Sequence, residues 1–179
     1  MESSSENKAH SPNEGRTLVV MAKAPRPGAV KTRLAPSLTP EAVTAFYCCL
    51  LDDTLALARS LSGVEIAIMC PDSDVNELAQ LAGNEARIVA QKGEGLAAGL
   101  TSVFAHFADA HQRRIIAFNS DSPHLPRSVL EDAFEALTAH DVVVGPTTTS
   151  CAASVSNASS RTERGRCGLS LLKAITRRW

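Results

Sequence analysis

Apolar segments alternate with helical patterns along the first 146 residues of the chain. Segments typical of strands occur at 17–22, 64–70, 86–91, 114–121 and 141–146. The first of them, TLVVMA, is a continuous apolar run, as expected of a strand covered on both faces. Helical patterns lie between them, at 38–61, 74–83, 95–112 and 126–140. This alternation predicts right-handed βαβ crossovers and an α/β fold, in which a mostly parallel, doubly wound sheet lies between two layers of helices.

The first predicted helix has recognisable start signals. Thr39 is a candidate N-cap, Pro40 occupies the first helical position and Glu41 lies just inside the first turn. Five apolar residues recur at helical spacing: Val43, Phe46, Leu50, Leu57 and Leu61.

Length and charge limit the classes of protein that fit. With 179 residues the chain suits about one domain with a substantial core. Its net charge of -1 gives no global positive field, so we expect no nucleic-acid partner. Residues 1–15 are polar and predict a disordered tail. The sequence contains no run of about 18 apolar residues and no signal-peptide core, which predicts a cytoplasmic protein without an integral membrane segment.

The loop after the first strand, VMAKAPRPGAVKTRLAP (20–36), combines cations with prolines. The cations are Lys23, Arg26, Lys31 and Arg33. Because proline fixes φ and restricts the residue before it, this loop loses less entropy on ordering than a glycine- and serine-rich loop. An arginine fork grips two phosphate oxygens and a lysine supplies a compact charge. The pattern indicates a phosphate clamp, with a solvated basic turn as the alternative; it is not a P-loop, because Val30 and not glycine precedes Lys31.

A second segment with unusual chemistry, NSDSPHLP (119–126), follows another predicted strand. Ligands of doubly wound sheets bind beyond the carboxyl ends of the strands, where the strand order reverses. At such a place Asp121 can hold Mg²⁺ or Mn²⁺ together with substrate phosphates. The alternative is that Asp121 and Ser122 only cap the next turn. We expect His124 to be a turn residue rather than a ligand.

Taken together, KAPRPGAVKTRLAP, NSDSPHLP and the later Gly145-Pro146 resemble a bacterial transferase family with the glycosyltransferase-A fold. Its members are associated with radical SAM and selenodomain proteins and are similar to phospholactate and molybdenum cofactor guanylyltransferases. The resemblance covers about residues 17–146. It implies a Rossmann-like sheet of the nucleotide-diphospho-sugar transferase type, and makes residues 16–146 a nucleotide-binding domain.

The resemblance also implies which residues form the site. It assigns nucleotide and diphosphate binding to Lys23, Pro25, Gly28, Lys31, Arg33 and Leu34. A looser match in KGEGLAAGL (92–100) adds Gly95, where glycine permits close approach of the backbone. The metal-binding aspartate maps onto Asp121, with Mg²⁺ or Mn²⁺ as the cofactor. The family motif commonly reads D-x-P-D-L, so His124 stands where a second aspartate is frequent.

Residues 147–179 depart from the family pattern and from the composition of the domain. The family continues with a D-G-G-Y-Y-L-like motif, whereas this segment contains no aspartate and has six cations against Glu163, a net charge of +5. Three explanations stay open for this basic tail: a natural tail that binds a partner or a membrane surface, a divergent acceptor region, or the product of a frameshift or truncation after Pro146. Its end, GLSLLKAITRRW, favours a short basic amphipathic helix.

The motifs therefore predict a metal-assisted transferase with a nucleotide-activated donor. The donor is a nucleotide sugar if the chain is a glycosyltransferase, and a nucleoside triphosphate if it is a nucleotidyltransferase; the acceptor is unknown. A protein of another class, a catalytically inactive remnant that binds a nucleotide or a partner, is the alternative. No general base is assigned, because Asp52 and Asp53 are expected on a solvated face of the first helix.

Overall fold

The computed structural model of the chain describes residues 15–109, 114–145 and 173–176. Most of the predicted disordered tail and most of 147–179 lie outside the described residues, so the predictions made for them stay predictions.

The described strands form one sheet with the order β3-β2-β1-β4-β6-β5. Their bounds are Arg16–Met21 for β1, Glu65–Cys70 for β2, Arg87–Ala90 for β3, Arg114–Asn119 for β4, Val142–Val144 for β5 and Lys173–Thr176 for β6. The first four strands pair in parallel, whereas β6 runs antiparallel to both β4 and β5. The predicted α/β architecture with a mostly parallel sheet is confirmed.

The described residues include four α-helices, which occur where the sequence predicts them. They are α1 at Pro40–Arg59, α2 at Val75–Ala82, α3 at Gly95–Asp109 and α4 at Arg127–Ala136, with short 3-10 helices η1 at Thr32–Leu34 and η2 at Asp72–Asp74. Thr39 caps α1, because its hydroxyl accepts a hydrogen bond of 3.3 Å from the N–H of Ala42.

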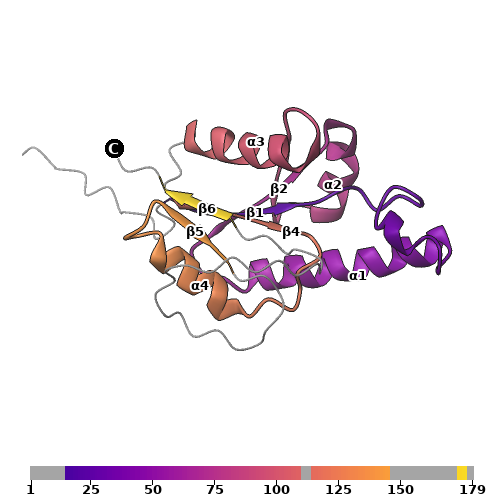
Figure 1. Cartoon of the computed structure of the whole chain (residues 1–179), viewed down its shortest axis with the longest axis horizontal. Coiled ribbons are helices and arrows are strands. Elements are labelled where there is room, and N and C mark those ends of the chain that lie inside the picture. Colours follow the sequence, from indigo (N-terminus) through magenta and orange to yellow (C-terminus); the bar gives the residue numbers. More distant parts are fainter. Residues whose placement is uncertain (1–14, 110–113, 146–172, 177–179) are drawn as a thin grey trace, which may run out of the picture.

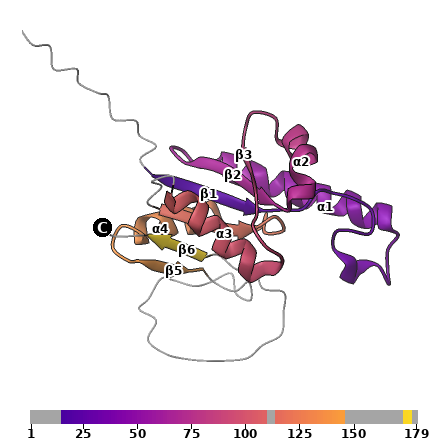
Figure 2. The ribbon, with the colours of Figure 1, turned by 90° about the horizontal axis from the view of Figure 1, so that it is seen from above.

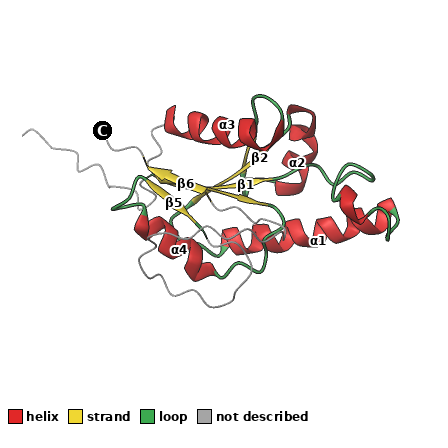
Figure 3. Cartoon of the chain, viewed as in Figure 1, coloured by secondary structure: helices red, strands yellow, loops and turns green. Residues whose placement is uncertain are grey.

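Two apolar cores lie on opposite faces of the sheet. Along β1, Leu18 and Val20 point into the core that α1 and α4 cover, whereas Val19 points into the core under α3. Figure 1 shows α3 above the sheet and α1 and α4 below it, and Figure 3 shows the same layers by type of structure. Leu78 of α2 belongs to the first core. The fold is thus a helix–sheet–helix sandwich in which the central strands β1, β2 and β4 are mostly buried.

The strand order reverses between β1 and β4. The chain moves outward from β1 through β2 to β3, and then returns to place β4 on the other side of β1. Met21 and Asn119 are paired in register at the carboxyl ends of these two strands. In both views, the loop after β1 and the start of α1 extend beyond these ends (Figure 1 and Figure 2). The two segments singled out by the sequence therefore leave the sheet side by side.

The apolar face of α1 differs from the set that recurs at helical spacing. Val43 and Leu61 of that set are buried, but Phe46 is 48% exposed. Tyr47 and Leu51, one position further along, are buried in its place. The buried stripe of α1 runs through Val43, Tyr47 and Leu51 at spacings of four, and Phe46 lies one position, about 100° around the helix, away from it.

The prediction of a helix at the end of the basic tail is wrong for Lys173–Thr176, because these residues form the strand β6. This strand lies between β4 and β5 and pairs its backbone with both. An isolated helix of about 12 residues is marginal in water, whereas two open strand edges offer backbone partners. Because β4 and β5 are distant from β6 in the sequence, no local sequence pattern predicts this pairing.

Candidate functional site

A cleft of about 1300 Å³ opens at the carboxyl ends of the strands. Its walls come from the loop after β1, α1, the start of α3 and the segment after β4. It contains six of the predicted site residues: Lys23, Lys31, Arg33, Leu34, Gly95 and Asp121. Pro25 and Gly28 are not among the lining residues. The cleft lies at the reversal of strand order, where ligands of this architecture bind.

Pro25 and Gly28 shape the loop rather than the wall of the cleft. The N–H of Arg26 donates to the carbonyl of Ala24 at 2.9 Å, which closes a tight three-residue turn around Pro25. The N–H of Ala29 donates to the carbonyl of Arg26 at 3.0 Å, and Gly28 has a φ of 77°. The central residues of this second turn are Pro27 and Gly28. Proline followed by a glycine of positive φ is the pattern of a type II turn.

Lys31 and Asp121, which both line the cleft, are in direct contact. Among the described residues other than glycine, Lys31 alone has a positive φ, of 46°. Such a left-handed conformation costs about 1–2 kcal/mol in a residue with a Cβ. The ammonium forms an ion pair with the Asp121 carboxylate and lies 5.9 Å from the centre of the Tyr47 ring. Local strain of this kind is a reason to suspect function.

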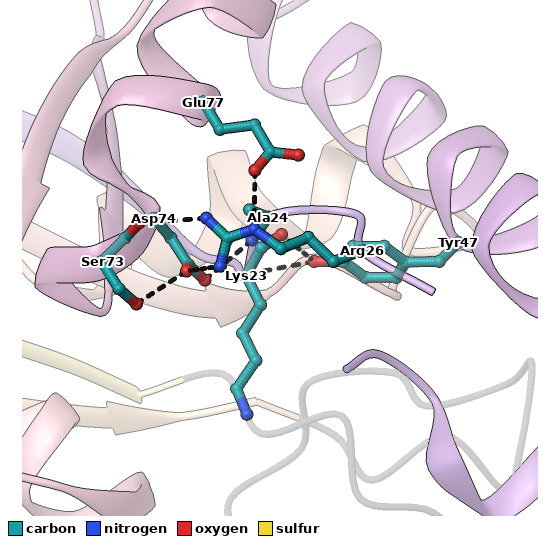
Figure 4. A network of polar contacts seen from close by, with 7 residues as sticks. All are labelled: Lys23, Ala24, Arg26, Tyr47, Ser73, Asp74 and Glu77. Atoms are coloured by element: carbon teal, nitrogen blue, oxygen red, sulfur yellow. Dashed lines mark hydrogen bonds and ion pairs between the residues drawn. The ribbon is translucent and has the colours of Figure 1, made fainter. Parts of the chain in front are cut away.

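Arg26, in contrast, is committed to a network within the protein (Figure 4). Its guanidinium donates to Asp74 at 2.7 Å, to Glu77 at 2.8 Å and to the carbonyl of Ser73 at 3.0 Å. Asp74 also accepts a hydrogen bond from the backbone N–H of Ala24 at 2.9 Å. This network, Arg26 with Ser73, Asp74 and Glu77, fastens the loop after β1 to the start of α2.

Tyr47 fastens the other side of the same loop. Its hydroxyl donates to the carbonyl of Lys23 and accepts from the N–H of Lys23, both at 3.1 Å. The same oxygen lies 3.0 Å from the Ser120 hydroxyl, next to Asp121. Burial raises the pKa of this phenol, so Tyr47 stays neutral near pH 7. One buried side chain of α1 thus sets the spacing between the loop and the end of β4.

Glycines line the wall that leads into α3. Gly93 and Gly95 have φ values of 77° and 83°. A Cβ at Gly95 would meet no protein atom within 4 Å, so here the backbone conformation, and not crowding within the chain, favours glycine.

The carboxylates of the cleft suit a metal that arrives with phosphate. In the described part of the chain, no three His, Cys, Asp or Glu side chains gather where one ion could reach them. Asp121 is 35% exposed and opens into the cleft, while His124 is not among the lining residues. Mg²⁺ is commonly held by one or two carboxylates together with substrate phosphates and water. The donor set fits such a site and does not fit a cage made by the protein alone.

The buried carboxylate of Asp74 gives the fold a predicted pH dependence. Burial by itself would raise the pKa of Asp74, but the Ala24 N–H, the Ser73 hydroxyl and Arg26 hold it below its ordinary value of 3.8. The resulting stabilisation is fully present above that value and is lost as the pH falls through the lower, folded value. Urea unfolding should give wild type a higher free energy of unfolding than Asp74→Asn. The difference between the two free energies should be constant from pH 7 to about pH 5 and should shrink below about pH 4. An unchanged difference at acid pH would contradict this assignment.

Several residues of the site have no signal in the sequence. Tyr47, Asp74 and Ser120 are ordinary residues of a helix, a turn and a strand end, and their roles depend on contacts between elements. Phe46 also lines the cleft. The exposure of this large apolar side chain on α1 could indicate a binding role, but the exposure is known only from the structure.

The fold is that of nucleotide-diphospho-sugar transferases, as solved structures show. A protein from Desulfovibrio desulfuricans G20, named "putative nucleotide-diphospho-sugar transferase", superposes with a TM-score of 0.73 at 21% identity, over 91% of this chain and 64% of that one. The 4-diphosphocytidyl-2C-methyl-D-erythritol synthase of Anaerococcus prevotii DSM 20548 gives a TM-score of 0.54 at 10% identity, over 94% and 73%. Another structure of a 4-diphosphocytidyl-2C-methyl-D-erythritol synthase gives a TM-score of 0.55 at 12% identity, over 91% of this chain and 75% of that one. The chain thus spans less than two thirds of the Desulfovibrio protein.

The family follows from the sequence itself. The chain belongs to the bacterial family described as "Uncharacterized protein conserved in bacteria (DUF2064)", which matches residues 54–149, more than half of its length. Comparison with curated protein sequences gives no match. Nowhere in the described residues does a helix combine the length and apolarity needed to cross a membrane.

Proposed function

We propose that this protein is a metal-assisted transferase that takes its group from a nucleotide-activated donor, with a nucleotide sugar as the first candidate. One observation carries the proposal: three cations of one loop and a carboxylate from another strand end face a single cleft at the reversal of strand order. We also propose that the chain is a transferase of the type associated with radical SAM and selenodomain proteins. The acceptor is a separate molecule whose class the site does not define.

In this proposal the chain's own residues grip the donor phosphates. Arg33 holds two phosphate oxygens with its planar fork, and Lys31 places a compact charge where negative charge builds on the leaving phosphates. Asp121 would hold Mg²⁺ or Mn²⁺ against the diphosphate, and the ion would supply further neutralisation of phosphate charge. Arg26 holds the loop and binds no phosphate, because Asp74 and Glu77 already occupy its donors.

Nucleotidyl transfer from a nucleoside triphosphate is the second candidate. Two of the proteins with the same fold are 4-diphosphocytidyl-2C-methyl-D-erythritol synthases. Both reactions need the same clamp, and they differ in the bond that breaks.

The products of turnover test the proposal. Incubation of the full chain with a donor in Mn²⁺, with water in place of the acceptor, should slowly hydrolyse that donor. A nucleotide sugar should give nucleoside diphosphate and free sugar, and a nucleoside triphosphate should give pyrophosphate and nucleoside monophosphate. Chelation with EDTA should stop the release, and Lys31→Gln with Arg33→Gln should slow it by at least about 100-fold. Nucleotide binding that chelator leaves unchanged, without release of either product, would instead favour a non-catalytic binding protein.

A further inference from the structure

The two ion pairs that fasten the loop after β1 differ in how permanent they are. In the pair between Arg26 and Asp74, the carboxylate side chain is 7% exposed and accepts further hydrogen bonds from Ala24 and Ser73. In the pair between Lys31 and Asp121, the side chains are 26% and 35% exposed. Breaking the first pair would strand a buried charge, whereas both members of the second can exchange partners with water or a ligand.

The backbone holds Lys31 in position for this exchangeable pair. Val30, the preceding residue, is 3% exposed and anchors the loop in the core. The carbonyl of Lys31, the residue before η1, accepts a hydrogen bond of 2.8 Å from the N–H of Leu34, the last residue of η1. These contacts and the φ of 46° hold the backbone of Lys31 at a place from which its side chain reaches Asp121.

The ion pair between Lys31 and Asp121 and a metal ion on Asp121 cannot coexist. A divalent ion on Asp121 would face the Lys31 ammonium at contact distance, and like charges at that distance repel. A diphosphate in the cleft offers Lys31 a more highly charged partner than one carboxylate.

We propose that Lys31 keeps Asp121 closed to metal until phosphate enters the cleft. A bound diphosphate draws the ammonium away and frees the carboxylate, so that metal and diphosphate bind cooperatively and metal alone binds weakly. This inference rests on the proposed function, since it concerns the same site. It adds the order of events: the anion, and not the free ion, opens the metal site.

Binding of Mn²⁺ alone tests the first half. Titration of the full-length protein, followed by the electron paramagnetic resonance of free Mn²⁺, should show weak binding to wild type. Lys31→Gln should bind Mn²⁺ at least about fivefold more tightly, which corresponds to the ~1 kcal/mol that a charge pair at about 4 Å is worth in water. Lys31→Arg keeps the charge and should behave as wild type. The double variant with Lys31→Gln and Asp121→Asn should lose the tighter Mn²⁺ binding of Lys31→Gln.

Lys23→Gln is the matched control for charge. Lys23 lines the same cleft, and its side chain points away from the polar network at its backbone (Figure 4). This variant removes the same unit charge and should change the affinity for Mn²⁺ less than twofold. Melting temperatures of all variants establish that they are folded. An equal gain in Lys23→Gln and Lys31→Gln would overturn the proposal, because the effect would then be one of overall charge.

Pyrophosphate tests the second half without requiring the right base. It should raise the affinity of wild type for Mn²⁺, and the rise should be smaller in Lys31→Gln. Asp121→Asn provides the baseline for metal carried in by the anion itself. If wild type binds pyrophosphate but Lys31→Gln gains no affinity for Mn²⁺, the inference fails and the proposed function survives. If no variant binds pyrophosphate or Mn²⁺, both fail.

Discussion

Asp121→Asn should lower metal-dependent turnover by about 100-fold or more, while the protein keeps its fold. The side chain is partly exposed and its partner Lys31 can turn to solvent, so the substitution leaves no buried charge behind. Loss of a metal ion that stabilises developing charge removes several kcal/mol from the transition state, and about 3 kcal/mol corresponds to roughly 100-fold. Product release with saturating donor and Mn²⁺ measures the effect.

Asp72→Asn is the matched control for that experiment. Asp72 also lines the cleft, but it belongs to η2 on the side of β2 and α2. It should retain most of the activity. Equal losses in the two variants would show that the cleft needs negative charge in general, and Asp121 would lose its special role.

Asp74→Ala should lower the free energy of unfolding by about 3 kcal/mol. The Asp74 side chain is buried and accepts hydrogen bonds from Ala24, Ser73 and Arg26. Its removal leaves the N–H of Ala24, in a residue 1% exposed, without its acceptor, and leaves Arg26 without its main anchor. Urea unfolding at pH 7 measures the loss.

A control on the same network separates Asp74 from its neighbour. Glu77, with a side chain 37% exposed, also binds Arg26, and Glu77→Ala should destabilise the protein far less. Asp74→Ala should also weaken nucleotide binding, although Asp74 is not among the residues of the cleft, because the loop loses its attachment to α2. Full stability in Asp74→Ala would show that the network does not hold the loop.

The parallel part of the fold could be predicted because its signals are local. A run such as TLVVMA identifies a strand buried on both faces, and Thr39 with Pro40 identifies the start of α1. Each signal depends on neighbours in the sequence. Asp121 could be selected for the same reason, since the end of an apolar run places it at the edge of the sheet.

What the sequence did not reveal depends on distant contacts. Asp74 acts through Ala24 and Arg26, some fifty residues earlier, and Tyr47 joins Lys23 to Ser120. The strand β6 comes from a segment whose composition favours another structure, and its position is set by the edges of β4 and β5. Among the four cations of the loop, only these contacts show that Arg26 belongs to the scaffold.

Thermal unfolding of the full-length chain with a panel of nucleotides and nucleotide sugars tests the central claim most directly. Each ligand is added with Mn²⁺ and with EDTA, to wild type and to Asp121→Asn. At about 100 times its dissociation constant a ligand adds roughly 2.7 kcal/mol, which raises the midpoint by about 5–10 °C in a domain of this size. We expect one nucleotide to raise the midpoint of wild type, more in Mn²⁺ than in EDTA, and expect Asp121→Asn to lose the difference. Cooperative unfolding at a midpoint that no ligand shifts would contradict the assignment of the cleft to a nucleotide diphosphate.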